Sequence, residues 1–209
     1  MDFPTRLPRK ISTVDSGRTL YSVLIFMHKT LLFCGLSVLC SGAAHADKGA
    51  SRFASGAGTG AFLAAGVLLP LLRDGDVGKE RSLRAADSLL TSTLVTEGLK
   101  RVVRADRPND PNARDGFPSS HATAAFAVAT MQAHYRPREA FLWYGGAALI
   151  SASRVDLRQH RTRDVAAGAA IGYLTAKLEL RSDRGLLLRP FIKHEGQTRT
   201  AGLEFSRIF

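Results

Sequence analysis

Three short polar blocks stand among alanine-rich apolar segments, and their residue types suit chemistry on a phosphate group. In chain order they are Lys100-x6-Arg107-Pro108, Pro118-Ser119-Ser120-His121 and Ser153-Arg154-x5-His160-x3-Asp164. Together they supply three cations, two histidines, a hydroxyl and a carboxylate. Cations stabilise the charge that a transferring phosphoryl group spreads over its oxygens, and histidine can act as a nucleophile or as an acid. This set could hold a phosphate and displace one of its oxygens without a metal.

The first block pairs two cations at helical spacing. Lys100 and Arg107 lie seven residues apart, about two helical turns, so they share a face if the helix continues. Arginine suits phosphate because its planar guanidinium can bind two oxygens at once. Taken alone, the block is equally consistent with a solvated basic helix end that faces lipid headgroups.

The second block lies where a polar loop meets a helix. Free N–H groups and the helix dipole favour phosphate at such a junction. Ser119 could donate its hydroxyl to a phosphate oxygen, and His121 could protonate the leaving oxygen as a general acid. A plain serine N-cap with an incidental histidine explains the same four residues.

The third block places a carboxylate four residues after a histidine. On a helix, His160 and Asp164 would lie on one face, one turn apart. A carboxylate that accepts a hydrogen bond from one ring nitrogen leaves the other nitrogen free as a nucleophile. Arg154 could add the third cation. The alternative is a surface pair in which the helix dipole favours Asp164.

The N-terminus has the pattern of an export signal. A short positive start at Lys29 precedes the apolar run 31–39, and an Ala-x-Ala cleavage pattern ends at Ala46. We therefore expect residues 1–46 to be an N-terminal extension and signal peptide, and the protein to be exported to a periplasm or the periplasmic face of a membrane. The alternative is a signal anchor, a first transmembrane helix over 19–44.

Length and charge limit the classes of partner. The 209 residues allow one domain, and the formal net charge of +11 predicts a basic surface. Such a surface suits anionic lipid or a phosphorylated substrate, and the sequence has no recognisable nucleic-acid-binding motif. We expect a phosphorylated lipid or small phosphomonoester and a membrane surface as partners, and no nucleic acid. The sequence leaves open the oligomeric state and whether translation starts at Met1 or Met27.

Apolar periodicity predicts an all-α fold. We expect a single domain over 47–209: a bundle of about five core helices, with the helical core over 54–180, and a short C-terminal β-hairpin over 186–209. The first helical segment is apolar and about twenty residues long, enough to cross a bilayer. The five predicted helices are 54–73, 82–103, 121–133, 139–153 and 163–180.

The three blocks, in this order, resemble the type 2 phosphatidic acid phosphatase (PAP2) and vanadium haloperoxidase superfamily, and the resemblance covers Lys100 to Asp164. It implies that His160 is the nucleophile and forms a phosphohistidine, that Asp164 orients it, and that His121 protonates the leaving group and then activates water. No metal or cofactor is implied, and vanadate could inhibit as a transition-state mimic. The implied phosphate-binding residues are Lys100, Arg107, Ser119, Arg154 and, through its backbone N–H, Ser120.

Two departures from the family pattern concern the shape of the site. Ser120 stands where the family usually has glycine, which adds bulk beside the phosphate. Only the nine residues 109–117 connect the first two blocks, which predicts no large lid.

The expected function is therefore a metal-independent phosphatase for phosphomonoesters or pyrophosphates. Lipids such as phosphatidic acid, polyprenyl pyrophosphate or a phosphorylated glycolipid are the expected substrates. The alternatives are a soluble periplasmic acid phosphatase of broad specificity, a vanadium haloperoxidase, and an inactive membrane-surface scaffold.

Overall fold

A computed structural model describes residues 48–182, 185–195 and 198–205, with the backbone alone for 189–205. Backbone contacts divide the chain into Met1–Val38 and Leu39–Phe209, and all described residues belong to the second unit. The predicted extension and signal peptide, 1–46, therefore lie outside the described residues.

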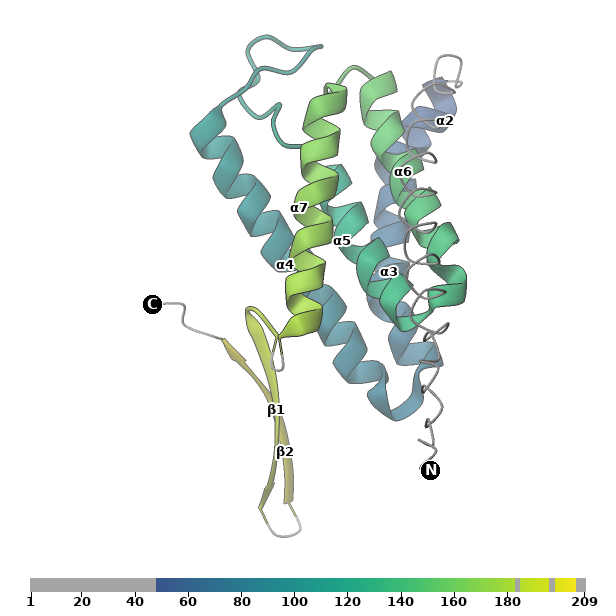
Figure 1. Ribbon diagram of the computed structural model, residues 1–209, viewed down its shortest axis with the longest axis vertical. Helices are drawn as coiled ribbons and strands as arrows, with labels where there is room; N and C mark the ends of the chain where they lie inside the picture. Colours follow the sequence, from purple (N-terminus) through teal and green to yellow (C-terminus); the bar gives the residue numbers. More distant parts are fainter. Residues whose placement is uncertain (1–47, 183–184, 196–197, 206–209) are drawn as a thin grey trace, which may run out of the picture. The chain divides into compact units, whose positions relative to one another are not determined.

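The described chain is a helical bundle, as the sequence predicts (Figure 1). Helix α5 is central, because it packs against α3, α4, α6 and α7. The helices are α2 (Lys48–Phe53), the π-helix η2 (Ala54–Gly58), α3 (Thr59–Arg73), η3 (Gly75–Val77), α4 (Gly78–Val103), α5 (Ser120–Tyr135), η4 (Pro137–Glu139), α6 (Ala140–Asp156) and α7 (Thr162–Arg181).

Small residues let α7 approach α5 closely. A Cβ atom on Gly172 would lie 2.1 Å from the carbonyl oxygen of Thr123, and one on Gly168 would lie 2.5 Å from that of Ser119. Ala122 on the facing helix is also fully buried. Because no larger side chain separates the two backbones, the first turns of α5 and α7 are held side by side.

The first helical stretch contains two irregularities. At its start the π turn places Gly56 at φ −109° and ψ −105°, and the Thr59 hydroxyl donates to the Ala54 carbonyl at 2.7 Å. Near its end Pro70 has no N–H for the Gly66 carbonyl. The buried Gln132 amide of α5 supplies the missing donor, at 2.5 Å.

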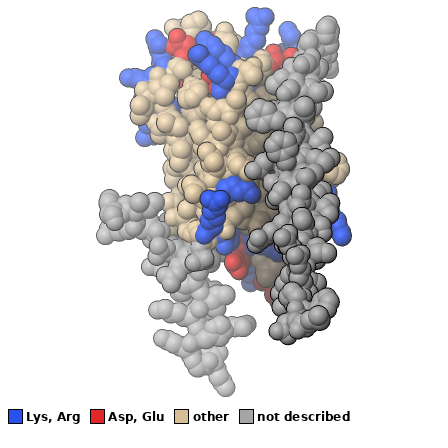
Figure 2. All heavy atoms as spheres, viewed as in Figure 1, with Lys and Arg blue, Asp and Glu red and all other residues tan. Residues whose placement is uncertain are grey.

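Among the described residues, Lys48–Arg73 is the one helical stretch that is long and apolar enough to cross a membrane, with a mean hydropathy of 1.6. Large apolar side chains elsewhere in the bundle are also exposed, including Val102 at 81%, Phe141 at 72% and Leu142 at 59%. In Figure 2, Lys and Arg gather over the loop after α4 and the start of α7, a second group lies lower, and the surface between them lacks charge.

Beyond α7 the chain is fastened to the bundle through its backbone. The fully buried Asp87 of α4 accepts the N–H groups of Leu186, Leu187 and Leu188 at 2.8–3.1 Å. Strands β1 (Leu188–Glu195) and β2 (Thr198–Phe205) then pair antiparallel. Residues 196–197 between them lie outside the described residues, so the C-terminal hairpin stays a prediction.

Candidate active site

The three sequence blocks meet at one end of the bundle. Lys100 lies in the last turn of α4, which ends because Arg104 adopts a left-handed conformation with φ 49° and ψ 42°. The second block begins α5, and the third spans the end of α6 and the start of α7. Close packing of α5 against α4, α6 and α7 brings these helix ends together.

Lys100 belongs to a ring of hydrogen bonds. Its Nζ donates to Ser120 Oγ and, at 3.0 Å, to Glu97 Oε1. Ser120 Oγ in turn donates to the same Glu97 oxygen at 2.9 Å. The serine that replaces the family's usual glycine therefore contacts the lysine directly, and one ammonium hydrogen stays available for a phosphate oxygen.

Arg107 is held by Asp115, which lies in the same loop. Arg107 Nε donates to Asp115 Oδ1 at 2.7 Å, and Nη2 donates to Oδ2 at 2.5 Å. This fork holds the pKa of Asp115 below its usual value. It also leaves the Nη1 edge of the guanidinium without a partner among the described residues, and that edge can bind phosphate.

Ser119 has a buried hydroxyl with no partner. Its backbone N–H donates to the Asp164 carbonyl at 3.0 Å, and its own carbonyl accepts the Thr123 N–H at 3.0 Å. The side chain is fully buried, yet Oγ makes no hydrogen bond within the described part of the chain and does not cap α5. A buried hydroxyl in this state is costly, and a phosphate oxygen would satisfy it.

His160 and Arg154 are joined by the backbone between α6 and α7. The Arg154 carbonyl accepts the N–H groups of Gln159 at 3.0 Å and His160 at 3.2 Å. The His160 ring is buried, and Nδ1 lies 2.9 Å from the Gly116 carbonyl. A carbonyl can only accept, so Nδ1 carries the proton and Nε2 is the unprotonated nitrogen.

Asp164 does not hydrogen-bond the His160 ring, although the resemblance implies that it orients it. Its Oδ2 accepts the backbone N–H of Arg161 at 2.7 Å, and Oδ1 lies 3.5 Å from Arg163 Nε. A carboxylate in the first turn of a helix stabilises the unpaired N–H groups there, which explains this arrangement. The charge of Asp164 still acts on His160, where it slightly offsets the lowering of the ring's pKa by burial.

Both histidines are held neutral by their surroundings. Burial and the charge of Arg154 lower the pKa of His121 to about 4, although the nearby Ser55 carbonyl acts in the opposite direction. Burial, followed by the Arg154 and Arg107 charges, also lowers the pKa of His160. A neutral His160 is ready to act as a nucleophile, whereas His121 must gain a proton before it can act as an acid.

Arg154 completes the set of cations. Only 5% of the residue is exposed, and burial followed by the charge of Arg107 lowers its pKa to about 10. Its Nη1 donates to Ser55 Oγ in the π turn. Its Nε, like Ser119 Oγ, has no partner among the described residues. Buried donors without partners therefore come from two sides of the site.

Four residues of this site were not singled out from the sequence: Ser55, Glu97, Asp115 and Gly116. Glu97 lies one helical turn before Lys100, and this spacing was the signal that could have identified it. Asp115 and Gly116 lie in a loop without periodicity, and Gly116 acts through its backbone carbonyl. Ser55 lies in an apolar stretch, in an irregular turn of the helix that periodicity does not reveal.

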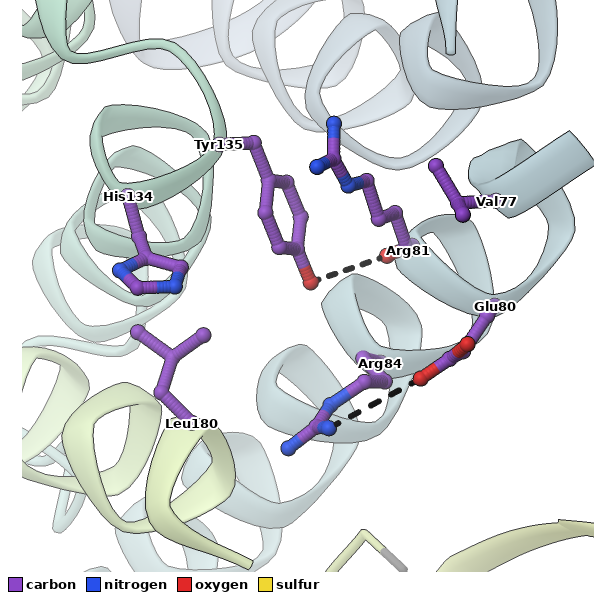
Figure 3. Close-up of a pocket in the computed structure, with 7 residues that line it drawn as sticks. All are labelled: Val77, Glu80, Arg81, Arg84, His134, Tyr135 and Leu180. Carbon is purple, nitrogen blue, oxygen red and sulfur yellow. Dashed lines mark hydrogen bonds and ion pairs between the residues drawn. The ribbon is translucent and has the colours of Figure 1, made fainter. Parts of the chain in front are cut away.

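A cavity of about 300 Å³ lies among residues at the start of α4 and the ends of α5 and α7 (Figure 3). Its arginines are already paired: Arg81 with Asp74 at 3.0 Å, and Arg84 with the buried Glu179 at 3.3 Å. Because neither is free to bind an anion, this cavity is a poor phosphate site. Its lining residues are Val77, Glu80, Arg81, Arg84, His134, Tyr135 and Leu180.

The described residues contain no group of three or more His, Cys, Asp or Glu side chains that could hold a metal ion. The described residues form a helical bundle with three cations, Lys100, Arg107 and Arg154, gathered at one end beside a histidine whose Nε2 is unprotonated. Residues 82–185 match the family model of the PAP2 superfamily. The chain belongs to this superfamily, whose members are phosphatases. No curated protein and no solved structure matched the chain.

Proposed function

We propose that this protein is an exported, metal-independent phosphatase that removes phosphate from phosphorylated lipids through a phosphohistidine at His160. One observation carries the proposal: the buried, unpartnered Ser119 Oγ and Arg154 Nε belong to the same site as the free Nε2 of His160. These donors suit the equatorial oxygens of a phosphoryl group under attack by that nitrogen.

In the first step, the Nε2 lone pair of His160 forms a bond to phosphorus, and the bond from phosphorus to the ester oxygen breaks. The electron pair of that bond goes to the leaving oxygen, and His121 transfers its proton there, which releases an alcohol. Lys100, Arg107 and Arg154 balance the charge on the phosphoryl oxygens throughout.

In the second step, neutral His121 takes a proton from water as the water oxygen attacks phosphorus. The bond from phosphorus to nitrogen breaks, its electrons return to His160, and inorganic phosphate leaves. The low pKa of His121 fits this scheme, because a bound phosphate dianion would offset the Arg154 charge and raise that pKa.

The exposed apolar side chains support a lipid substrate. Within the described part of the chain they occur on α4, α6 and α7 as well as on α3, which belongs to the stretch that could cross a membrane. Fully burying a large apolar side chain is worth roughly 1.5–3 kcal/mol, so contact with lipid chains would stabilise this surface. We infer that the protein binds a membrane and hydrolyses lipids whose phosphates lie at its periplasmic face, such as phosphatidic acid, polyprenyl pyrophosphate or a phosphorylated glycolipid.

The test is phosphate release in the presence of EDTA, with wild type and His160→Ala compared on an aryl phosphate and on phospholipids in mixed micelles. We expect release by wild type alone, with a preference for lipid and with inhibition by vanadate. Preference for soluble esters, together with failure to partition into detergent, would favour a soluble periplasmic phosphatase. Halide oxidation with added vanadate, in place of phosphate release, would indicate a haloperoxidase. The absence of phosphate release and of halide oxidation with every substrate would favour an inactive scaffold.

A further inference from the structure

The π turn after α2 contributes to the active site from outside the matched family region, which begins at residue 82. Ser55 lies in this turn with 8% of its surface exposed. Two of its groups contact two different members of the site. Its Oγ accepts a hydrogen bond from Arg154 Nη1, and its backbone carbonyl faces the His121 ring closely enough to raise the pKa of that ring.

We propose that Ser55 is the positioning residue that sets the geometry of Arg154 and His121, so that phosphate binding and leaving-group protonation depend on the π turn. This inference rests on the proposed phosphatase function. Ser55 touches neither the phosphate nor the leaving group in this scheme, and it acts only through the two side chains that it holds.

The hydroxyl accounts for the action on Arg154. With Nη1 tied to Ser55 Oγ, Nε is left as the buried donor without a partner, available to the phosphate. Loss of the hydroxyl would leave Nη1, like Nε, without a hydrogen-bond partner in the described part of the chain. The Arg154 side chain would then be free to turn. A hydrogen bond to a charged group is worth enough to change affinity about tenfold.

The carbonyl accounts for the action on His121. A carbonyl beside the ring favours a proton on the ring nitrogen nearest to it, and so influences which nitrogen faces the leaving oxygen. A π turn winds one extra residue into the helix, and such turns are frequent at functional sites. Gly56 has non-helical φ and ψ and marks a kink between two helical segments. Its deletion would alter this kink and turn Ser55 relative to α3 by about 100°, the angle of one helical residue.

The first experiment compares Ser55→Ala, Ser55→Thr and the control Ser51→Ala. Ser51 lies one turn earlier on the same helix and is similarly buried, at 4% exposure. We expect Ser55→Ala to weaken inhibition by vanadate and by inorganic phosphate about tenfold. Ser55→Thr keeps the hydroxyl and should restore most of the binding, and Ser51→Ala should match wild type.

The second experiment deletes Gly56 and compares an alkyl phosphate with an activated aryl phosphate. An activated leaving group needs little protonation, so misplacement of His121 should slow the alkyl ester far more than the aryl ester. Merely local damage would slow both esters equally. Thermal unfolding shows whether the deletion variant folds, and the serine variants test the proposal independently of it.

Equal vanadate inhibition of wild type, Ser55→Ala and Ser51→Ala would overturn the proposal, as would an equal loss on both esters in a folded deletion variant. Failure of the proposed function looks different, because wild type itself would then release no phosphate and bind no vanadate.

Discussion

Replacement of Gly116 by alanine tests whether the loop carbonyl orients the nucleophile. A Cβ atom at this position would lie 2.4 Å from the Asp106 carbonyl oxygen and 3.0 Å from that of Ala105. An ordinary contact begins near 3.4 Å, so the loop must move by about 1 Å to admit the methyl group. Both obstacles are backbone atoms, and the Gly116 N–H is bonded to the Ala105 carbonyl at 2.7 Å.

Such a shift would break the hydrogen bond from His160 Nδ1 to the Gly116 carbonyl. The bond is 2.9 Å long, and a further 1 Å takes it beyond hydrogen-bonding distance. A misplacement of 1 Å in a catalytic group can reduce the rate about 100-fold, and loss of the tautomer preference acts in the same direction. We therefore expect kcat to fall about 100-fold in Gly116→Ala.

The assay is phosphate release from an aryl phosphate, with thermal unfolding measured alongside. Gly98→Ala is the matched control, because Gly98 is exposed on α4 and a Cβ atom there would meet nothing within 4 Å. It should keep full activity and gain stability of up to about 1 kcal/mol from helix propensity. A folded Gly116→Ala enzyme with kcat within twofold of wild type would refute the role of this carbonyl.

Three further predictions concern charge and the unusual serine. Burial and Arg154 lower the pKa of His121 to about 4, so the protonated form of His121 in the free enzyme is lost above that pH. We therefore expect kcat/KM on alkyl phosphates to fall as pH rises. A rise of kcat/KM through neutral pH would contradict this. Burial, together with the adjacent Asp87, raises the pKa of Glu179 to about 7 from 4.5, so stability should decline by about 3 kcal/mol as pH rises through this range. Glu179→Gln should flatten that dependence in thermal unfolding, and an unchanged slope would exclude Glu179 as its source. Ser120→Gly removes the hydroxyl that accepts a hydrogen bond from Lys100. We expect KM to rise a few-fold, about the effect of one hydrogen bond, and kcat to change little. An unchanged KM would show that the hydroxyl does not position Lys100.

Much of the site could be predicted because helix geometry is local. The places of Lys100 near the end of α4 and of His121 at the start of α5 follow from helical periodicity and from the polar loop between them, although the Ser119 hydroxyl does not cap α5. Alanine-rich segments also indicate helices that can pack closely, as α5 does. The bundle and the convergence of its polar helix ends followed from these patterns.

The parts that could not be predicted depend on backbone groups and tertiary contacts. Asp164 had two candidate partners, and Arg161, the N-cap residue just before α7, decided between them by offering a free N–H. The acceptor for His160 is a carbonyl, which any residue in the loop could have supplied. The irregular turn that holds Ser55 is absent from the apolar pattern, because periodicity does not distinguish a π turn from an α-helix.

The central claim is that His160 carries the phosphoryl group, and a trapping experiment tests it most directly. Wild type and His160→Ala would be mixed with an activated aryl phosphate in EDTA, quenched within milliseconds under alkaline conditions, and mapped by mass spectrometry. We predict a phosphohistidine at residue 160 in wild type, none in His160→Ala, and greater accumulation in His121→Ala, which cannot activate water. Phosphate release by wild type without any modified His160, or a phosphoryl group on another residue, would contradict the account.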